Sequence, residues 1–138
     1  MQITHQADYA IRTIFYLSRL NPNQKVATSQ IAADYKIPPS FLTKIISQLS
    51  IAGLIHTSRG ARGGVILARS PEEITLLDVL QAIDGPVALN ECAQEPCICP
   101  FAGECVLHDF WVGASEELNN RLRSTTFAKM VEAGSFTI

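Results

Sequence analysis

The stretch PPSFLTKIISQLSIAGLIHTSRGARGGVILAR, residues 38–69, constrains the fold more than any other part of the chain. Apolar residues at helical spacing follow two prolines and stop at Gly53, which predicts an amphipathic helix with Ser40 as its N-cap. Two short runs of strand-forming residues then flank RGARGG, and this pattern predicts a β-hairpin with a glycine-rich tip. The chain therefore has to place a helix directly before a basic hairpin.

The residues before this stretch predict two further helices. THQADYAIRTIFYLSRL has apolar residues near helical spacing and Thr4 as its candidate N-cap, and ATSQIAADYKI predicts a short helix capped by Thr28 or Ser29. The apolar stripe of the next helix is expected in the core: Phe41, Leu42, Ile45, Ile46 and Leu49. Two short helices and a basic hairpin predict a winged helix-turn-helix, a mostly α fold with a small β-wing.

Charge is divided unequally along the chain. Residues 1–70 hold eight basic and two acidic residues, a formal charge of +6, whereas residues 71–138 hold three basic and eleven acidic residues, a formal charge of −8. A basic half joined to an acidic half is expected where only one face meets a polyanion. The sequence therefore predicts a DNA-binding winged helix-turn-helix over 1–70, with a cysteine loop and dimerisation helices over 71–138, in one compact unit.

Polar side chains on the helix before the hairpin are suited to base edges in a major groove. They are Ser40, Thr43, Lys44, Ser47 and Gln48. The alternative for Lys44 and Gln48 is a plain solvated helix face.

Other candidates for DNA contact flank this helix in the sequence. Ser29 and Gln30 lie near the start of the preceding helix, where side chains and free backbone N–H groups contact phosphates. In the hairpin, Arg59 or Arg62 is expected to enter the minor groove or to pair with phosphate. Duplex DNA is favoured over a single strand, which requires several exposed aromatic side chains for stacking.

The acidic half continues with helices. SPEEITLLDVLQAID predicts one amphipathic helix, and a second is expected from about Glu104 to Arg123. The aromatic residues Phe110 and Trp111 make this second, long helix the natural dimer seam, although both could equally be ordinary core. Because a domain this small offers few contacts, specific binding favours a homodimer on a palindromic operator in double-stranded DNA.

All four cysteines lie in the segment ECAQEPCICPFAGECVLHDFW, with the spacing Cys92-x4-Cys97-x-Cys99-x5-Cys105 and His108 three residues later. The chain shows neither a signal peptide nor an apolar run long enough to span a bilayer, which predicts a cytoplasmic protein without membrane contact. In that reducing compartment, clustered thiols favour zinc or iron–sulfur binding over disulfides. The paired C-x-x-C spacing of zinc fingers and of redox sites is missing.

In these features the chain resembles the Rrf2 family of bacterial winged-helix regulators, whose members include the IscR, NsrR and RirA types. The resemblance rests on MQIT, ADYAIR, the RG-x-x-GG wing at residues 59–64, ITLLDVLQAID and the cysteine loop, which follow in the family's order over essentially the whole chain. It implies a homodimer with an iron–sulfur cluster, 2Fe–2S or 4Fe–4S, in each cysteine loop. It also implies that the state or loss of the cluster changes affinity for promoter DNA, most commonly in a repressor.

The resemblance also implies a ligand set. The family's three cysteine positions fall on Cys92, Cys99 and Cys105. Cys97 is an extra thiol, and it is an alternative to Cys99 because Cys92-x4-Cys97 resembles one known variant. The fourth ligand falls on His108, as in IscR-like members, or on Asp8, whose counterpart in NsrR-like members coordinates the cluster of the partner subunit; His108 is preferred because its local spacing is intact. Such a ligand holds iron less firmly than thiolate, which suits a sensor of nitric oxide, redox state or iron supply.

Two other interpretations stay open. One is a winged-helix regulator that binds zinc or no metal. The other is a small iron–sulfur or thiol redox protein in which the helix-turn-helix is only a scaffold. The basic half and its hairpin favour a regulator, because electron transfer needs no groove-reading helix. No nucleophile is placed beside a base in the sequence, which predicts that the protein is not an enzyme.

Overall fold

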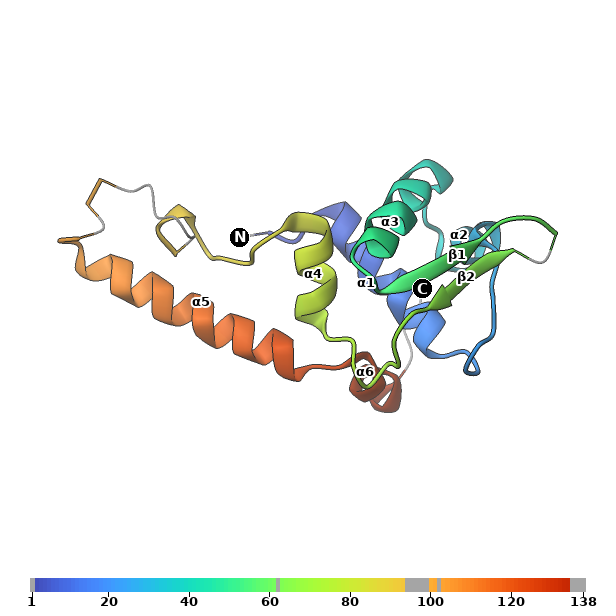
Figure 1. Cartoon of the computed structure of the whole chain (residues 1–138). Helices are drawn as coiled ribbons and strands as arrows, with labels where there is room; N and C mark the ends of the chain where they lie inside the picture. The colour runs from blue at the N-terminus through green and yellow to red at the C-terminus, as the bar shows by residue number, and fades with distance from the viewer. Residues whose placement is uncertain (1, 62, 94–99, 102, 135–138) are drawn as a thin grey trace.

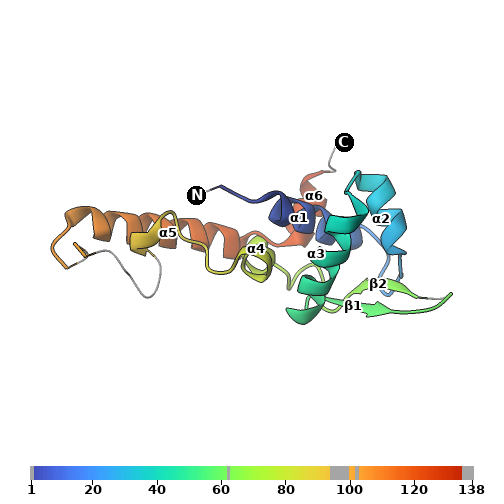
Figure 2. The same ribbon diagram turned by 90° about the horizontal axis from the view of Figure 1, so that it is seen from above.

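The computed structural model describes residues 2–61, 63–93, 100–101 and 103–134. In chain order its elements are α1 (His5–Ser18), α2 (Thr28–Tyr35), α3 (Pro39–Ile51), β1 (Ile55–Ser58), β2 (Gly64–Leu67), α4 (Leu76–Asp84), the 3-10 helix η1 (Glu91–Ala93), α5 (Val106–Ser124) and α6 (Phe127–Ala133). The first three helices and the hairpin form one end of the molecule, and α5 extends from it as a long arm (Figure 1, Figure 2). The predicted fold class is therefore confirmed.

The core at the winged end is built from the apolar stripes of α1 and α3. Ala10 and Ile14 of α1, with Leu42, Ile45 and Leu49 of α3, are completely shielded from solvent. Their spacing places them on one face of each helix. Other elements complete the same core with Ile31, Val65, Ile74, Val79 and Phe127. Because burying a large apolar side chain contributes roughly 1.5–3 kcal/mol, this shared cluster joins α4 and α6 to the winged end.

One predicted helix cap is present, and the structure adds a second cap that was not predicted. Thr4 is the N-cap of α1, accepting a hydrogen bond from the Ala7 N–H at 3.1 Å and donating its hydroxyl to Asp84 at the end of α4. Thr75 caps α4 in a reciprocal capping box with Asp78. Each such cap stabilises its helix by about 1 kcal/mol. The start of α1 is therefore tied to α4, the helix on which α5 packs.

Two predicted caps are wrong. The N-cap of α2 is Ala27, so Thr28 is already the first helical residue, and no side chain caps the free N–H groups of this helix. The N-cap of α3 is Pro38, which leaves Ser40 inside the first turn. Proline suits the first helical position because it has no N–H to satisfy, and Pro39 fills that position here. The hydroxyls of Thr28 and Ser40 are thereby not used as caps.

The wing is attached to the helices at its base. Its two antiparallel strands place Ser58 opposite Gly64, and Val65 exchanges backbone hydrogen bonds of 3.1 and 2.8 Å with Val26, just before α2. A Cβ atom on Gly64 would lie 2.8 Å from the carbonyl oxygen of Val26. Only glycine allows this close approach, which fixes the wing beside the start of α2.

One aromatic residue of α3 departs from the predicted core. Phe41 is 42% exposed, although Leu42, Ile45 and Leu49 beside it are buried. The reason is geometric, because Phe41 lies about 90° around the helix from the centre of the buried stripe. Its ring packs instead against Tyr9 of α1, with the ring centroids 6.0 Å apart.

Candidate DNA-binding groove and cysteine loop

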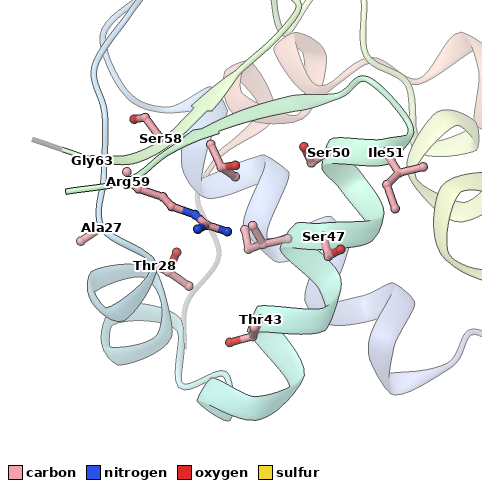
Figure 3. A pocket seen from close by; sticks show the side chains of 12 residues that line it. Ala27, Thr28, Thr43, Ser47, Ser50, Ile51, Ser58, Arg59 and Gly63 are labelled. Carbon is pink, nitrogen blue, oxygen red and sulfur yellow. The ribbon is translucent and has the colours of Figure 1, made fainter.

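A groove of about 490 Å³ lies between α3 and the wing (Figure 3). The start of α2 forms one wall, α3 forms the opposite wall, and the wing closes one end. Figure 3 shows the Arg59 side chain reaching from the wing into this groove, toward Thr28 of α2 and toward Thr43 and Ser47 of α3. The groove therefore gathers a cation and several hydroxyl groups from three separate elements.

The predicted base-reading residues lie along the exposed side of α3. Thr43 and Ser47 line the groove, and Ser40 and Lys44 are exposed on the same helix. The Thr43 hydroxyl donates to the Pro39 carbonyl at 3.0 Å, so its oxygen is left as an acceptor. These side chains offer both donors and acceptors at positions that face solvent.

The remaining predicted contacts are placed differently. Gln48 is half-buried, and its amide oxygen is fully covered with no hydrogen-bond partner among the described residues. Ser29 is exposed. Gln30 is exposed too, but its amide nitrogen donates to the carboxylate of Asp34 at 2.8 Å. Arg62 lies outside the described residues.

A polar network joins α1 to α2 behind these residues. The hydroxyl of Tyr16 donates to the second carboxylate oxygen of Asp34 at 2.6 Å, and the Tyr16 ring packs edge-on against Tyr35 at 5.0 Å. Burial, together with this hydrogen bond and the charge of Asp34, raises the pKa of Tyr16 to about 12. Asp34 therefore holds both Gln30 and Tyr16, and it fixes α2 on α1.

Four hydroxyl-bearing groove residues were not predicted from the sequence as DNA contacts: Thr28, Ser50, Thr57 and Ser58. Thr28 was interpreted as a helix cap, and its place as first residue of an uncapped helix is the signal that could have identified it. The other three hydroxyls became candidates only when the fold brought the end of α3 beside the wing.

The cysteine loop leads from η1 to the start of α5. Cys92 lies in η1 and Cys105 is the N-cap of α5, and both side chains are half-buried. His108 is half-buried in the first turn of α5, where its backbone N–H donates to the Cys105 carbonyl at 3.1 Å. Cys97 and Cys99 lie outside the described residues. Within the residues that are described, no three His, Cys, Asp or Glu side chains form a metal-binding group.

The approach to Cys92 is anchored along α5. The Leu89 N–H donates to the hydroxyl of Ser115 at 3.1 Å, and the side-chain amide of Asn119 donates to the Val87 carbonyl at 3.0 Å. Beyond this anchor, η1 packs against α5 (Figure 1). The start of the cysteine loop is therefore fixed to α5, which is the same helix that follows directly after the end of the loop.

Asp8, the alternative fourth ligand, lies elsewhere. It occupies the first turn of α1, where its carboxylate pairs with the Arg12 guanidinium at 3.1 Å. An acidic side chain is stabilised near a helix N-terminus, and an i,i+4 ion pair adds a further small contribution. Asp8 therefore has a local structural role in its own helix.

The long helix α5 has two different halves. Leu118 and Leu122 in its second half pack against a buried cluster made of Ala7, Leu77, Leu80 and Val87. In the first half three large apolar residues face solvent, whereas Trp111 is half-buried: Val106 is 81% exposed, Leu107 58% and Phe110 61%. The first half of α5 is thus outside the core of this chain.

Comparison with known proteins identifies the chain. Residues 3–133 match the family model of Rrf2, described as an iron-dependent transcriptional regulator. The chain belongs to the Rrf2 family. A relative in Aquifex aeolicus, named as an HTH-type transcriptional regulator, is 30% identical over 125 residues, which cover 89% of this chain and 86% of that protein. One in Mycobacterium tuberculosis with the same kind of name is 34% identical over 129 residues, covering 93% and 80%.

Solved structures show the same fold. CymR (YrzC), the global cysteine regulator of B. subtilis, superposes with a TM-score of 0.80 at 23% identity, over 98% of this chain and 99% of that chain. IscR of T. potens superposes with a TM-score of 0.77 at 24% identity, over 100% and 94%. The predicted family is confirmed, and because Rrf2 proteins are transcriptional regulators, this chain is a regulator and not an enzyme. Among the described residues, no helix has the length and apolar composition needed to cross a bilayer.

Proposed function

We propose that this Rrf2 regulator binds an operator duplex through α3 and the wing, and that an iron–sulfur cluster at the cysteine loop controls that binding. One observation carries the sensing half of the proposal. Cys92 and Cys105 are half-buried cysteines at the two ends of a loop, and both ends are fixed to α5. Thiolates in such a loop suit iron–sulfur clusters.

The groove supports the assignment of the DNA contacts. The proposed contact residues are Ser29, Gln30, Ser40, Thr43, Lys44, Ser47, Gln48, Arg59 and Arg62. The middle of α3 would read base edges in the major groove, while the wing arginines contact phosphate or the minor groove. The formal charge of +6 on residues 1–70 supplies the attraction to the duplex.

The exposed half of α5 supports a homodimer. Val106, Leu107 and Phe110 form an apolar surface on a helix that projects from the winged end (Figure 2). Exposed apolar patches of this kind mark interaction sites, and a second copy of the chain would cover both surfaces at once. Two copies would then present two α3 helices to a palindromic operator.

The donor set fits a cluster by its chemistry. The ligands would be Cys92, Cys99, Cys105 and His108, with Cys97 and Asp8 as the alternatives. The ion pair between Asp8 and Arg12 favours His108, because Asp8 would have to leave Arg12 in order to bind iron. When bound, the cluster supplies a centre that responds to redox state, nitric oxide or iron supply.

The chain's own packing supports a route from the loop to the DNA-binding end. Ser115 and Asn119 hold the start of the loop on α5, and α5 packs on α4 through Leu118 and Leu122. Helix α4 in turn contacts both α1 and α3. A change in how the loop lies on α5 would therefore bias the spacing of the two α3 helices in a dimer, which is a proposed coupling.

The second candidate is an Rrf2 regulator that binds zinc or no metal. It is favoured by the likeness to CymR, a structure named for cysteine regulation. The small redox protein is disfavoured by the family assignment.

We infer that the protein represses transcription at its promoter. A reporter gene placed behind the operator tests this inference, because deletion of the regulator should raise expression of the reporter.

Cluster binding is tested on protein purified without oxygen. We expect a broad visible absorption band with matching iron and sulfide, because thiolate-bound iron–sulfur centres absorb in this way. Cys99→Ser should abolish the band and Cys97→Ser should keep it, so the two variants form a matched pair. His108→Ala should make the band more labile than Asp8→Ala does. Colourless protein without iron and sulfide would refute the cluster and favour the second candidate.

A further inference from the structure

Helix α3, which is proposed to enter the major groove, carries one exposed aromatic ring that is not among the proposed DNA contacts. Phe41 lies in the first turn of α3 and is 42% exposed. It follows Ser40 directly and precedes Lys44 by three residues, so it shares a side of the helix with Lys44. Single exposed apolar residues are common on protein surfaces, and exposure alone therefore assigns nothing.

A second observation is that this ring is held in place. The Phe41 ring packs on Tyr9 with a centroid separation of 6.0 Å and an angle of 60° between the planes. Tyr9 is half-buried and also lies beside His5, whose ring centroid is 6.4 Å away. Tilted aromatic contacts of this kind are favourable, so the side chain is fixed against α1 while part of its ring still faces solvent.

The ring also has a defined place relative to the groove. Thr43 lines the groove on the side of α3 that faces the wing. Because successive helical residues are separated by about 100°, Phe41 points to the flank opposite to Thr43. The exposed side of α3 therefore presents hydroxyl and ammonium groups in its middle and on the wing side, and one rigid apolar surface on the other side.

Base chemistry leaves one partner for such a surface. In the major groove the base edges present mainly hydrogen-bond donors and acceptors, and the C5-methyl group of thymine is the one apolar group that projects from them. An apolar ring pressed against polar edges would desolvate them without a hydrogen bond, which is unfavourable. We propose that Phe41 contacts the C5-methyl group of a thymine and makes the regulator specific for a 5-methylpyrimidine at one position of each operator half-site. This inference rests on the proposed function, in which α3 enters the major groove.

The test changes a single methyl group. The probe is a duplex selected from a randomised pool with the wild-type protein, in which each thymine is replaced in turn by deoxyuridine. We expect one position in each half-site where this replacement weakens binding about three- to fivefold, the effect of losing one buried methyl group. Phe41→Ala should bind the thymine and uracil duplexes equally. Phe41→Leu, which keeps an apolar side chain, should retain part of the discrimination.

The control is Ile3→Ala, which removes an exposed apolar residue that lies before α1 and outside α3, and which should discriminate as the wild type does. A cytosine at the sensitive position, compared with 5-methylcytosine, shows whether the methyl group is recognised on either pyrimidine. Wild-type protein that binds the selected duplex but responds to no thymine overturns this inference alone. The same conclusion follows if Phe41→Ala keeps the full preference for thymine. Failure to bind any duplex overturns the proposed function as well.

Discussion

At the scale of the residue, Tyr16 and Asp34 show how much one pair of side chains contributes to the position of a helix. Both Asp34 oxygens are used, one by the Tyr16 hydroxyl and the other by the Gln30 amide. Arg19 extends the contact by donating to the Tyr35 hydroxyl at 3.1 Å. Side-chain hydrogen bonds of this type each add on the order of 1 kcal/mol, and more when one partner is charged. Together they set the position of the uncapped start of α2.

The raised pKa of Tyr16 predicts a specific alkaline response. The pKa of about 12 in the folded chain exceeds the ordinary value of 10.0, so the unfolded chain loses this proton first. The contribution of the hydroxyl to stability is therefore complete below pH 10 and is lost as the pH rises toward 12. Urea unfolding across this range should show a steeper loss for the wild type than for Tyr16→Phe. Parallel curves for the two proteins would contradict this role.

At the scale of the element, periodicity predicted the helices better than their edges. The buried stripes of α1 and α3 follow from spacing, because a helix brings residues three and four apart onto one face. Phe41 was misplaced because it lies at the margin of its stripe, where burial depends on how much of the ring Tyr9 covers. The start of α5, predicted near Glu104, lies at Val106. The groove could not be predicted, since it exists only where α2, α3 and the wing meet in space.

The wing predicts a measurable electrostatic effect. Arg59→Ala should weaken duplex binding and lower the slope of log affinity against log salt by about one, because one fewer counterion is released. Arg123→Ala removes the same charge from α5, far from the groove in sequence, and should leave the slope unchanged. Fluorescence anisotropy at several salt concentrations measures both slopes. Equal slopes for wild type and Arg59→Ala would exclude contact between Arg59 and phosphate.

The exposed half of α5 predicts a dimer that depends on its aromatic residue. Phe110→Ala should weaken dimerisation by roughly 2 kcal/mol, about 30-fold, as is usual for a central aromatic in an interface. Glu116 lies on another side of the same helix, so Glu116→Ala should leave the dimer intact. Sedimentation equilibrium measures both. A monomeric wild type, or a dimer insensitive to Phe110→Ala, would place the interface elsewhere.

At the scale of the whole molecule, one packed body links the cysteine loop to the DNA-binding end. The main core contains residues from both sides of residue 70, such as Leu49 of α3 and Phe127 of α6. The predicted division at residue 70 therefore concerns the charge and the proposed role of the two halves, and it stays a prediction. The sequence supplied the family and the chemistry of the ligands, because motifs and cysteines are local. It could not supply the anchoring of the loop on α5, which depends on contacts between Leu89 and Ser115.

The central claim is that the state of the cysteine loop controls DNA binding, and one measurement tests it directly. A single sample purified without oxygen is divided, and the cluster is removed from one half by a chelator and an oxidant. The affinity of both halves for the same selected duplex is then measured at one salt concentration, since affinity depends strongly on salt. The account predicts a difference of about 5- to 150-fold, the usual range of coupling between two sites. Equal affinities would contradict it.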